Sequence, residues 1–157
     1  MNSTTRKSPI AYIPPPLLYA IPFLAGFFIQ RLMLGAHHPP NAPSQVIGIA
    51  LMLLALIPAA SALLLFAYNR TTVIPHGKPS RLVTSGPYRV TRHPMYLSLT
   101  LVYLGVALWT RTWFAIPFLL VPVLLVNRYT MPAEEARLRD LFGDAYAAYC
   151  SRVRRWL

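Results

Sequence analysis

Long apolar runs constrain this chain of 157 residues more than any other feature of its sequence. Residues 16–34 and 46–68 are apolar almost throughout, and at about 1.5 Å per residue each can cross roughly 30 Å of hydrocarbon as a helix. Two shorter runs, residues 95–109 and 113–127, flank a brief polar turn and predict a tight helical hairpin. The sequence therefore predicts an all-α integral-membrane helical bundle with about four spanning helices, followed by short C-terminal helices.

The composition agrees with a membrane protein. The chain is 55% hydrophobic and only 12% charged, whereas soluble domains are about a quarter charged. Its formal charge of +11 does not indicate nucleic acid, because the basic residues lie beside apolar spans, where they favour anionic lipid headgroups as partners. We expect a single domain over residues 1–157. Residues 1–70 supply two spanning helices, and residues 71–157 supply a loop, the hairpin and a polar tail.

The distribution of Lys and Arg predicts the topology. Basic residues gather in the N-terminal tail, in the loop at residues 71–96 and in the C-terminal tail, whereas the other two turns have only Arg111 and the flanking Arg31. Four spans place all three cationic segments on one side, which the positive-inside rule assigns to the cytoplasm. We therefore expect a multi-pass protein of the cytoplasmic (inner) membrane with both termini in the cytoplasm.

The loop at residues 71–96 is the long segment that is neither apolar nor clearly helical. A loop of this length is usually functional or disordered. Disorder fits poorly, because Leu82, Val83, Tyr88 and Tyr96 are groups that a solvated linker does not need. We interpret it as an ordered cationic loop at a membrane surface that holds an anionic or zwitterionic small molecule.

Each motif near this loop also has a purely structural interpretation. Gly86-Pro87 reads as a turn, and Pro94 as the start of a helix. The pair Glu134-Glu135 suits a helix N-terminus after Pro132, which we expect to interrupt the preceding helix and to turn the acids back toward the loop.

Further along the chain, Arg128 can be a snorkelling anchor, and Tyr146, Tyr149 and Trp156 can be interfacial anchors. Gly143 predicts the end of a helix. No metal is expected, because the His37-His38 pair has no acidic or cysteine partner nearby.

Taken together, these motifs resemble the isoprenylcysteine carboxyl methyltransferase family, to which the phospholipid N-methyltransferases look related. The resemblance covers about half of the chain, from residue 71 onward. It rests on Leu82-Val83-Thr84-Ser85-Gly86-Pro87-Tyr88, Arg92-His93-Pro94-Met95-Tyr96-Leu97, the hairpin, Arg128, Glu134-Glu135, Leu138, Phe142-Gly143, Tyr146, Tyr149 and Arg152-Val153.

This resemblance implies a membrane methyltransferase that uses S-adenosylmethionine, without a metal and without a Rossmann fold. It implies that the cofactor lies between the loop and the tail. The cofactor-binding residues would be Leu82, Val83, Tyr88, His93, Pro94, Met95, Tyr96 and one or both of Glu134 and Glu135. Arg128 matches a family arginine near the acceptor group, and it would be the catalytic residue.

The methyl acceptor is expected to be a lipophilic small molecule or a lipid. Arg128 favours a carboxylate, such as a prenylcysteine-like group, because a cationic side chain favours an anionic partner. A phospholipid amine and a small apolar thiol are the alternatives within the same activity. The alternative from another class is a non-catalytic membrane protein whose basic loop binds anionic lipid.

Overall fold

The computed structural model describes residues 9–35, 42–68 and 81–156, and every regular element in these ranges is helical. Residues 9–35 and 42–68 contain a short 3₁₀ turn η1 (Pro9–Tyr12) and two long helices, α1 (Pro15–Leu34) and α2 (Ala42–Tyr68). The 3₁₀ turn η2 (Gly86–Arg89) leads into α3 (Pro94–Trp109). The remaining elements are α4 (Ala115–Phe118), α5 (Leu120–Leu125), the π-helical turn η3 (Val126–Thr130) and α6 (Met131–Cys150). The part of the loop at residues 71–80 lies outside the described residues.

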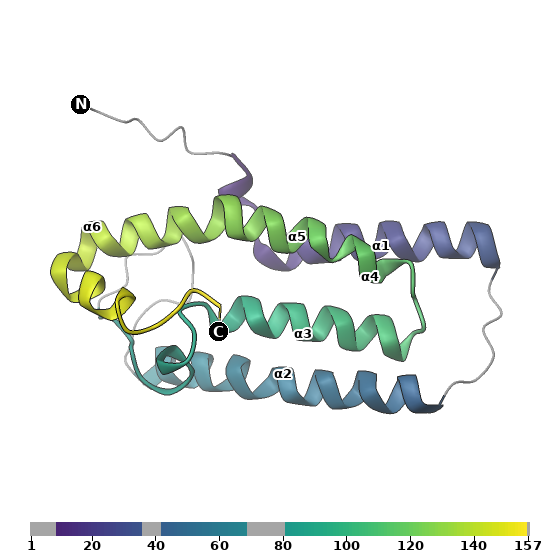
Figure 1. Cartoon of the computed structure of the whole chain (residues 1–157), viewed down its shortest axis with the longest axis horizontal. Helices are drawn as coiled ribbons and strands as arrows, with labels where there is room; N and C mark the ends of the chain where they lie inside the picture. Colours follow the sequence, from purple (N-terminus) through teal and green to yellow (C-terminus); the bar gives the residue numbers. More distant parts are fainter. Residues whose placement is uncertain (1–8, 36–41, 69–80, 157) are drawn as a thin grey trace.

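The helices form a bundle in which α3 lies between α2 on one side and the layer of α1, α4 and α5 on the other (Figure 1). The end of α2, η2, the start of α3 and the end of the α6 segment gather at one end of the bundle. The turn between α3 and α4 lies at the opposite end (Figure 1). The elements that carry the predicted residues Tyr88, His93 and Tyr96 therefore meet α6 at the end of the bundle where α3 starts.

Small residues let the helices approach closely. A Cβ atom added to Gly48 of α2 would lie 2.6 Å from the carbonyl oxygen of Gly105 in α3, and one added to Gly26 of α1 would lie 2.6 Å from Cα of Ala115. Close backbone approach at small residues is typical of helix pairs in membranes, where van der Waals contact replaces the hydrophobic effect.

Polar side chains complete the joints between the helices. The Gln30 amide donates to the Arg111 carbonyl at 2.7 Å and accepts from the Phe114 N–H at 3.1 Å, which ties the end of α1 to the turn before α4. The Tyr103 hydroxyl donates to the Ala115 carbonyl at 2.8 Å. In an apolar environment these bonds satisfy backbone groups that a turn leaves unpaired.

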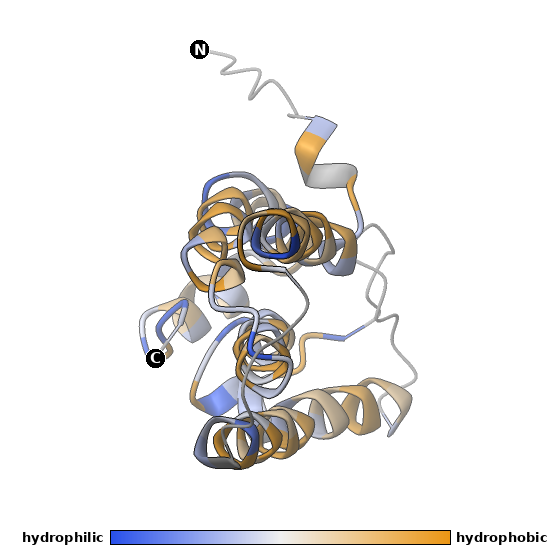
Figure 2. Ribbon diagram, turned by 90° about the vertical axis from the view of Figure 1, so that its right-hand side faces the viewer, coloured by the Kyte–Doolittle hydropathy of each residue, from blue (hydrophilic) through white to orange (hydrophobic). Residues whose placement is uncertain are grey.

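Three helical stretches are long and apolar enough to cross a membrane, namely Pro15–Leu34, Pro43–Tyr68 and Ala115–Cys150, while Pro94–Trp109 is a shorter apolar helix. Apolar residues make up much of the helical ribbon, with polar segments between them (Figure 2), and many large apolar side chains of α1 and α2 are exposed. The all-α membrane bundle predicted from the sequence is confirmed.

The prediction for the second arm of the hairpin was wrong in one respect. We expected it to end near residue 127 and Pro132 to interrupt the helix, but the helical stretch that begins at Ala115 continues past Pro132 into α6. The π turn η3 absorbs the proline: the Met131 N–H donates to the Val126 carbonyl five residues back, in the wide turn that precedes Pro132. Because proline clashes with the carbonyl four residues earlier in a regular helix, a wider turn there lets the helix continue. The break occurs at Gly143, whose φ of 49° is the left-handed value that glycine adopts easily.

Candidate active site

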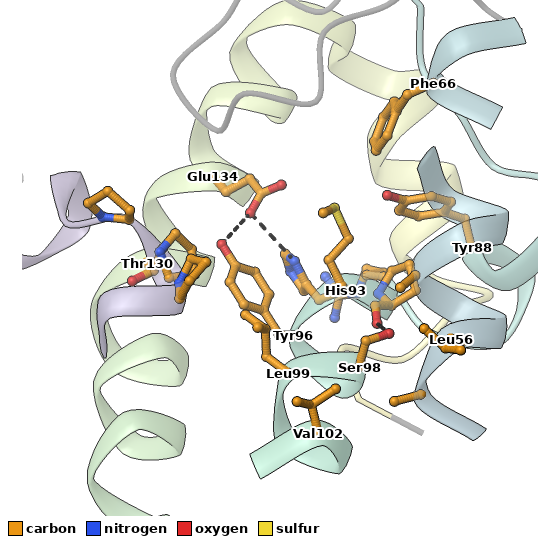
Figure 3. A pocket seen from close by; sticks show the side chains of 18 of the residues that line it. Leu56, Phe66, Tyr88, His93, Tyr96, Ser98, Leu99, Val102, Thr130 and Glu134 are labelled. Atoms are coloured by element: carbon orange, nitrogen blue, oxygen red, sulfur yellow. Dashed lines mark hydrogen bonds and ion pairs between the residues drawn. The ribbon is translucent and has the colours of Figure 1, made fainter. Parts of the chain in front are cut away.

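A cavity of about 550 Å³ lies at the end of the bundle where the loop and α6 meet (Figure 3). One wall is polar and comes from η2, the start of α3, and the η3–α6 junction. The other wall is apolar and comes from the start of α1 and the middle of α2. The lining residues are Ile13, Pro14, Pro15, Pro16, Ala55, Leu56, Ala59, Phe66, Tyr88, Arg92, His93, Pro94, Met95, Tyr96, Ser98, Leu99, Val102, Thr130 and Glu134.

Six of the predicted cofactor residues line this cavity, although they come from three elements. They are Tyr88, His93, Pro94, Met95, Tyr96 and Glu134. Pro94 begins α3, which suits a residue without an N–H at a first helical turn, and it places Met95 and Tyr96 in that turn. The cavity is therefore where the loop motif and Glu134 come together.

The two adjacent glutamates have different surroundings. Glu134 faces the cavity with its side chain 31% exposed, accepts a hydrogen bond from the Tyr96 hydroxyl at 3.2 Å, and lies 3.7 Å from Nδ1 of His93 (Figure 3). Glu135 is buried and does not line the cavity. Its Oε1 lies 3.2 Å from Nε2 of His93 and 3.1 Å from Nη1 of Arg92. His93 thus has one carboxylate beside each ring nitrogen.

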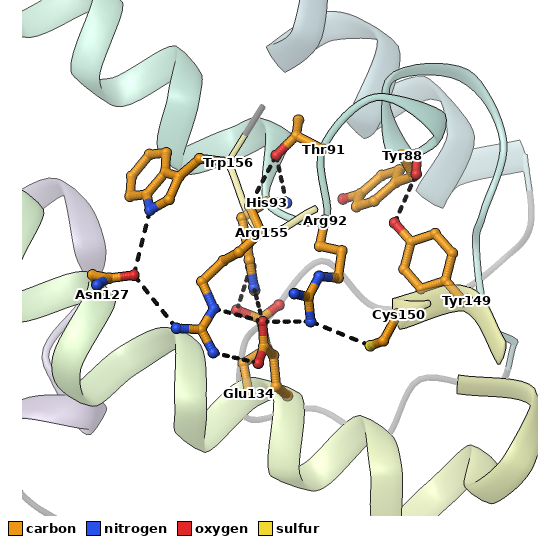
Figure 4. A network of polar contacts seen from close by, with 11 residues as sticks. Tyr88, Thr91, Arg92, His93, Asn127, Glu134, Tyr149, Cys150, Arg155 and Trp156 are labelled. Carbon is orange, nitrogen blue, oxygen red and sulfur yellow. Dashed lines mark hydrogen bonds and ion pairs between the residues drawn. The ribbon is translucent and has the colours of Figure 1, made fainter. Parts of the chain in front are cut away.

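The buried carboxylate is held from its other side by the end of the described chain. Arg155 donates to Oε1 of Glu135 from Nε at 2.9 Å and to Oε2 from Nη2 at 2.7 Å. The hydrogen bond to Glu135 raises the pKa of Arg155 above its ordinary value, so this guanidinium stays charged. The Asn127 side-chain oxygen accepts from Nη1 of Arg155 at 3.5 Å and from Nε1 of Trp156 at 3.3 Å (Figure 4).

Tyrosines fix the loop against α6. The Tyr149 hydroxyl donates to the Tyr88 carbonyl at 2.7 Å (Figure 4), and Tyr146 and Tyr149 are both buried. The expectation that these two are interfacial anchors is therefore wrong. Trp156, which had the same expectation, is partly buried against the core. Burial, with the nearby Glu134 charge, raises the pKa of Tyr88, whose ring packs edge-on to Phe66 at 5.7 Å, so this hydroxyl is neutral.

The remaining predicted site residues lie outside the cavity lining. Val83 is buried and Leu82 is half-buried, but neither lines the cavity. Arg128 is exposed, with its guanidinium carbon 5.8 Å from the centre of the Tyr129 ring. Thr130, two residues later, does line the cavity, and residues two apart face different sides of a helix.

Sequence reasoning missed several residues of this region. Arg92 lines the cavity and also donates to the Cys150 sulfur at 3.2 Å. Its adjacency to His93 was the available signal. Asn127, a lone amide near the end of an apolar run, and Arg155 had no comparable signal. Among the residues that the structure describes, no group of three or more His, Cys, Asp or Glu side chains could hold a metal ion.

Fold and site together define an all-α membrane protein with a partly polar cavity between its loop and its last long helix. The sequence profile of the family described as "Phospholipid methyltransferase" matches residues 43–145. The chain belongs to this family, which is part of the isoprenylcysteine carboxyl methyltransferase-like group, so the family predicted from the sequence is confirmed. It is accordingly a membrane methyltransferase.

An uncharacterised protein of Haemophilus influenzae is 40% identical over 63 residues, which are 40% of this chain and the whole of that relative. No solved structure matches the chain.

Proposed function

We propose that this protein transfers the methyl group of S-adenosylmethionine to a lipophilic, membrane-associated acceptor. The observation that carries the proposal is the two-sided cavity. Glu134, His93 and Tyr96 form its polar wall, and apolar residues of two lipid-exposed helices form the other. One ligand with a charged end and one apolar ligand could meet there.

The residues present fit S-adenosylmethionine. The cavity volume of about 550 Å³ is within the range of roughly 300–1,000 Å³ usual for small-molecule sites. Glu134 is a partly exposed carboxylate that would pair with the ammonium group. The faces of Tyr88 and Tyr96 can attract a sulfonium cation. Leu82 and Val83 would act from behind this layer, through the backbone of the loop.

When bound, S-adenosylmethionine supplies an electrophilic methyl group, and the protein's own contribution is orientation and exclusion of water. His93 and Tyr96 hold the Glu134 carboxylate from two directions. Holding two reactants in line can lower a barrier by about 7–11 kcal/mol. The apolar wall would keep water away from the cation, and fixed dipoles and rings of the protein would replace its hydration.

The apolar wall also indicates how the acceptor reaches the cavity. Ala55 and Ala59 of α2 and Pro15 of α1 line it, and both helices expose large apolar side chains elsewhere on their surfaces. An acceptor with an apolar chain can therefore enter between these helices from the bilayer. The charged ligand would enter from the end that carries η2 and α6.

Which acceptor group suits the site depends on the role of Arg128. A prenylcysteine-like carboxylate remains the prediction if Arg128 orients it as the catalytic residue, through two parallel hydrogen bonds. A phospholipid amine is the second candidate. It is favoured by the family match and by the exposed position of Arg128 away from the cavity lining, since an amine gains nothing from a cation.

We further propose that the protein lies in the cytoplasmic membrane with both termini in the cytoplasm. The site would then face the cytoplasm, where S-adenosylmethionine is made, and the basic tail would lie against anionic headgroups.

Two measurements test the function. Calorimetry with S-adenosylhomocysteine on the purified protein should give saturable binding, and a protein that only binds anionic lipid would give none. With methyl-labelled S-adenosylmethionine and a membrane-lipid extract, label should enter the lipid fraction. Ala59→Phe, which fills the apolar wall, should slow this transfer but preserve S-adenosylhomocysteine binding. Ala60→Phe, on the exposed neighbour that does not line the cavity, is the matched control.

A further inference from the structure

The last described residues of the chain cross the start of α3. Residues 153–156, which we call the C-terminal strap, are fixed there by their main chain. The Arg92 N–H donates to the Arg154 carbonyl at 3.0 Å, and the Thr91 hydroxyl donates to the Arg155 carbonyl at 2.9 Å. The strap therefore lies directly behind the two residues, Arg92 and His93, that face the cavity.

The Arg155 side chain then reaches from the strap to α6. Its two bonds to Glu135, at 2.9 and 2.7 Å, engage both carboxylate oxygens. A planar guanidinium that binds both oxygens fixes the plane of the carboxylate as well as its position. Its contact with Asn127 holds the guanidinium from its other edge.

Glu135 in turn contacts Arg92 and His93, which line the cavity. Its Oε1 is shared by Nε2 of His93, Nη1 of Arg92 and Nε of Arg155. The carboxylate is only 6% exposed, so water cannot easily take the place of a lost partner. Without the two bonds from Arg155, the Glu135 carboxylate could turn toward Arg92 and away from the imidazole of His93.

We propose that Arg155 is a positioning residue: through Glu135 it fixes the orientation of His93, and so the polar wall of the ligand cavity. Glu135 acts in the same way and does not contact the ligand, whereas Glu134 does. As far as the ligand is concerned, this inference rests on the proposed use of S-adenosylmethionine. The arrangement of the strap and His93 does not depend on that use.

The first experiment needs no ligand. The ring ¹⁵N resonances of His93, assigned from their loss in His93→Gln, are recorded in detergent for the wild type, Arg155→Gln and Arg139→Gln. Arg139 is an exposed arginine of α6. Arg139→Gln is therefore the control, because it removes one positive charge just as Arg155→Gln does. The resonance of Nε2 should move in Arg155→Gln and stay in place in Arg139→Gln. An unchanged Nε2 resonance in Arg155→Gln would overturn the proposal.

The second experiment measures S-adenosylhomocysteine affinity in a double-mutant cycle of Arg155→Gln and Glu135→Gln. Each single change should weaken binding by roughly tenfold, the middle of the range for coupled neighbours. Because Arg155 acts through Glu135, the double variant should bind no worse than Glu135→Gln. Additive losses would mean that Arg155 acts on the ligand independently, and the proposal would fail.

Arg155→Lys keeps the experiment decisive if Arg155→Gln does not fold. Lysine preserves the charge but cannot bind both oxygens in a fixed plane, so an intermediate shift of Nε2 and an intermediate loss of affinity are expected. Wild-type values in both measurements would refute the proposal. If the wild type does not bind S-adenosylhomocysteine, the proposed function is refuted, and the resonance of His93 still decides the role of Arg155.

Discussion

The two glutamates at the start of α6 should differ in how much stability is lost when each is changed to glutamine. Glu135→Gln removes a buried charge that meets Arg92, His93 and Arg155 within 3.2 Å. Breaking a buried ion pair costs about 3–5 kcal/mol. Because Arg155 is 33% exposed, solvent screens its ion pair with Glu135, and this pair contributes less to the unfolding free energy than a fully buried pair would. We therefore expect a loss of about 3 kcal/mol of unfolding free energy.

Glu134→Gln should affect binding and leave stability nearly unchanged. Its side chain is partly exposed, and a glutamine oxygen can still accept from the Tyr96 hydroxyl. Surface changes of this kind usually stay within about 0.5 kcal/mol. The lost charge-assisted bond to a ligand ammonium should cost about 1.5–3 kcal/mol, which is roughly ten- to a hundredfold in affinity.

Thermal unfolding in detergent and calorimetry with S-adenosylhomocysteine separate the two effects. For a chain of this size, about 3 kcal/mol corresponds to a fall in Tm of roughly 6–12 °C, which is expected for Glu135→Gln only. Glu134→Gln should unfold near the wild-type temperature and bind weakly. The division of roles would be refuted if Glu134→Gln lost the stability while Glu135→Gln kept it.

Three other predictions concern topology, packing and the acceptor. In a chain whose native cysteine is replaced by serine, cysteines introduced at Ser85 and Thr110 should react with an impermeant maleimide from opposite sides of the membrane; labelling from one side would exclude the four-span arrangement. Gly48→Val should destabilise the α2–α3 contact by about 1–3 kcal/mol, with a matching fall in Tm, whereas Ala50→Val on the exposed face should not. Arg128→Lys should leave the rate of phosphatidylethanolamine methylation unchanged but should slow the methylation of a prenylcysteine analogue. If the wild type and Arg128→Lys methylate the prenylcysteine analogue at the same rate, Arg128 takes no part in the reaction.

The sequence predicted the features that depend on local composition. The apolar runs indicate helices in a membrane whatever their neighbours are, and α1 and α2 follow them closely, although α2 begins earlier than expected, at Ala42. The loop motif and the acidic pair were predicted to meet, and His93 does contact both glutamates. The apolar runs are patterns of neighbouring residues, and the contacts of His93 with the glutamates join a basic side chain to acidic ones, so both can be predicted from the sequence.

The features that the sequence did not predict depend on long-range geometry. Arg155 and Glu135 are twenty positions apart, and nothing in the basic tail distinguishes Arg155 from Arg154. Their pairing exists because the chain turns back at Gly143, whose φ is positive, and because the strap bonds to the main chain of Arg92. Likewise Pro14, Pro15 and Pro16 at the start of α1 lie on the cavity wall only because the bundle brings α1 against it.

The π turn explains how one helix presents groups to both sides of this site. Asn127 and Glu135 are eight positions apart, and in a regular helix at about 100° per residue they would diverge by roughly 80°. A π turn takes up one extra residue, so that the eight positions return to nearly the same face, and both side chains reach Arg155. Glu134, one position earlier than Glu135, is then turned by about 100° toward the cavity. The wide turn before Pro132 therefore sets which glutamate meets the strap and which faces the cavity.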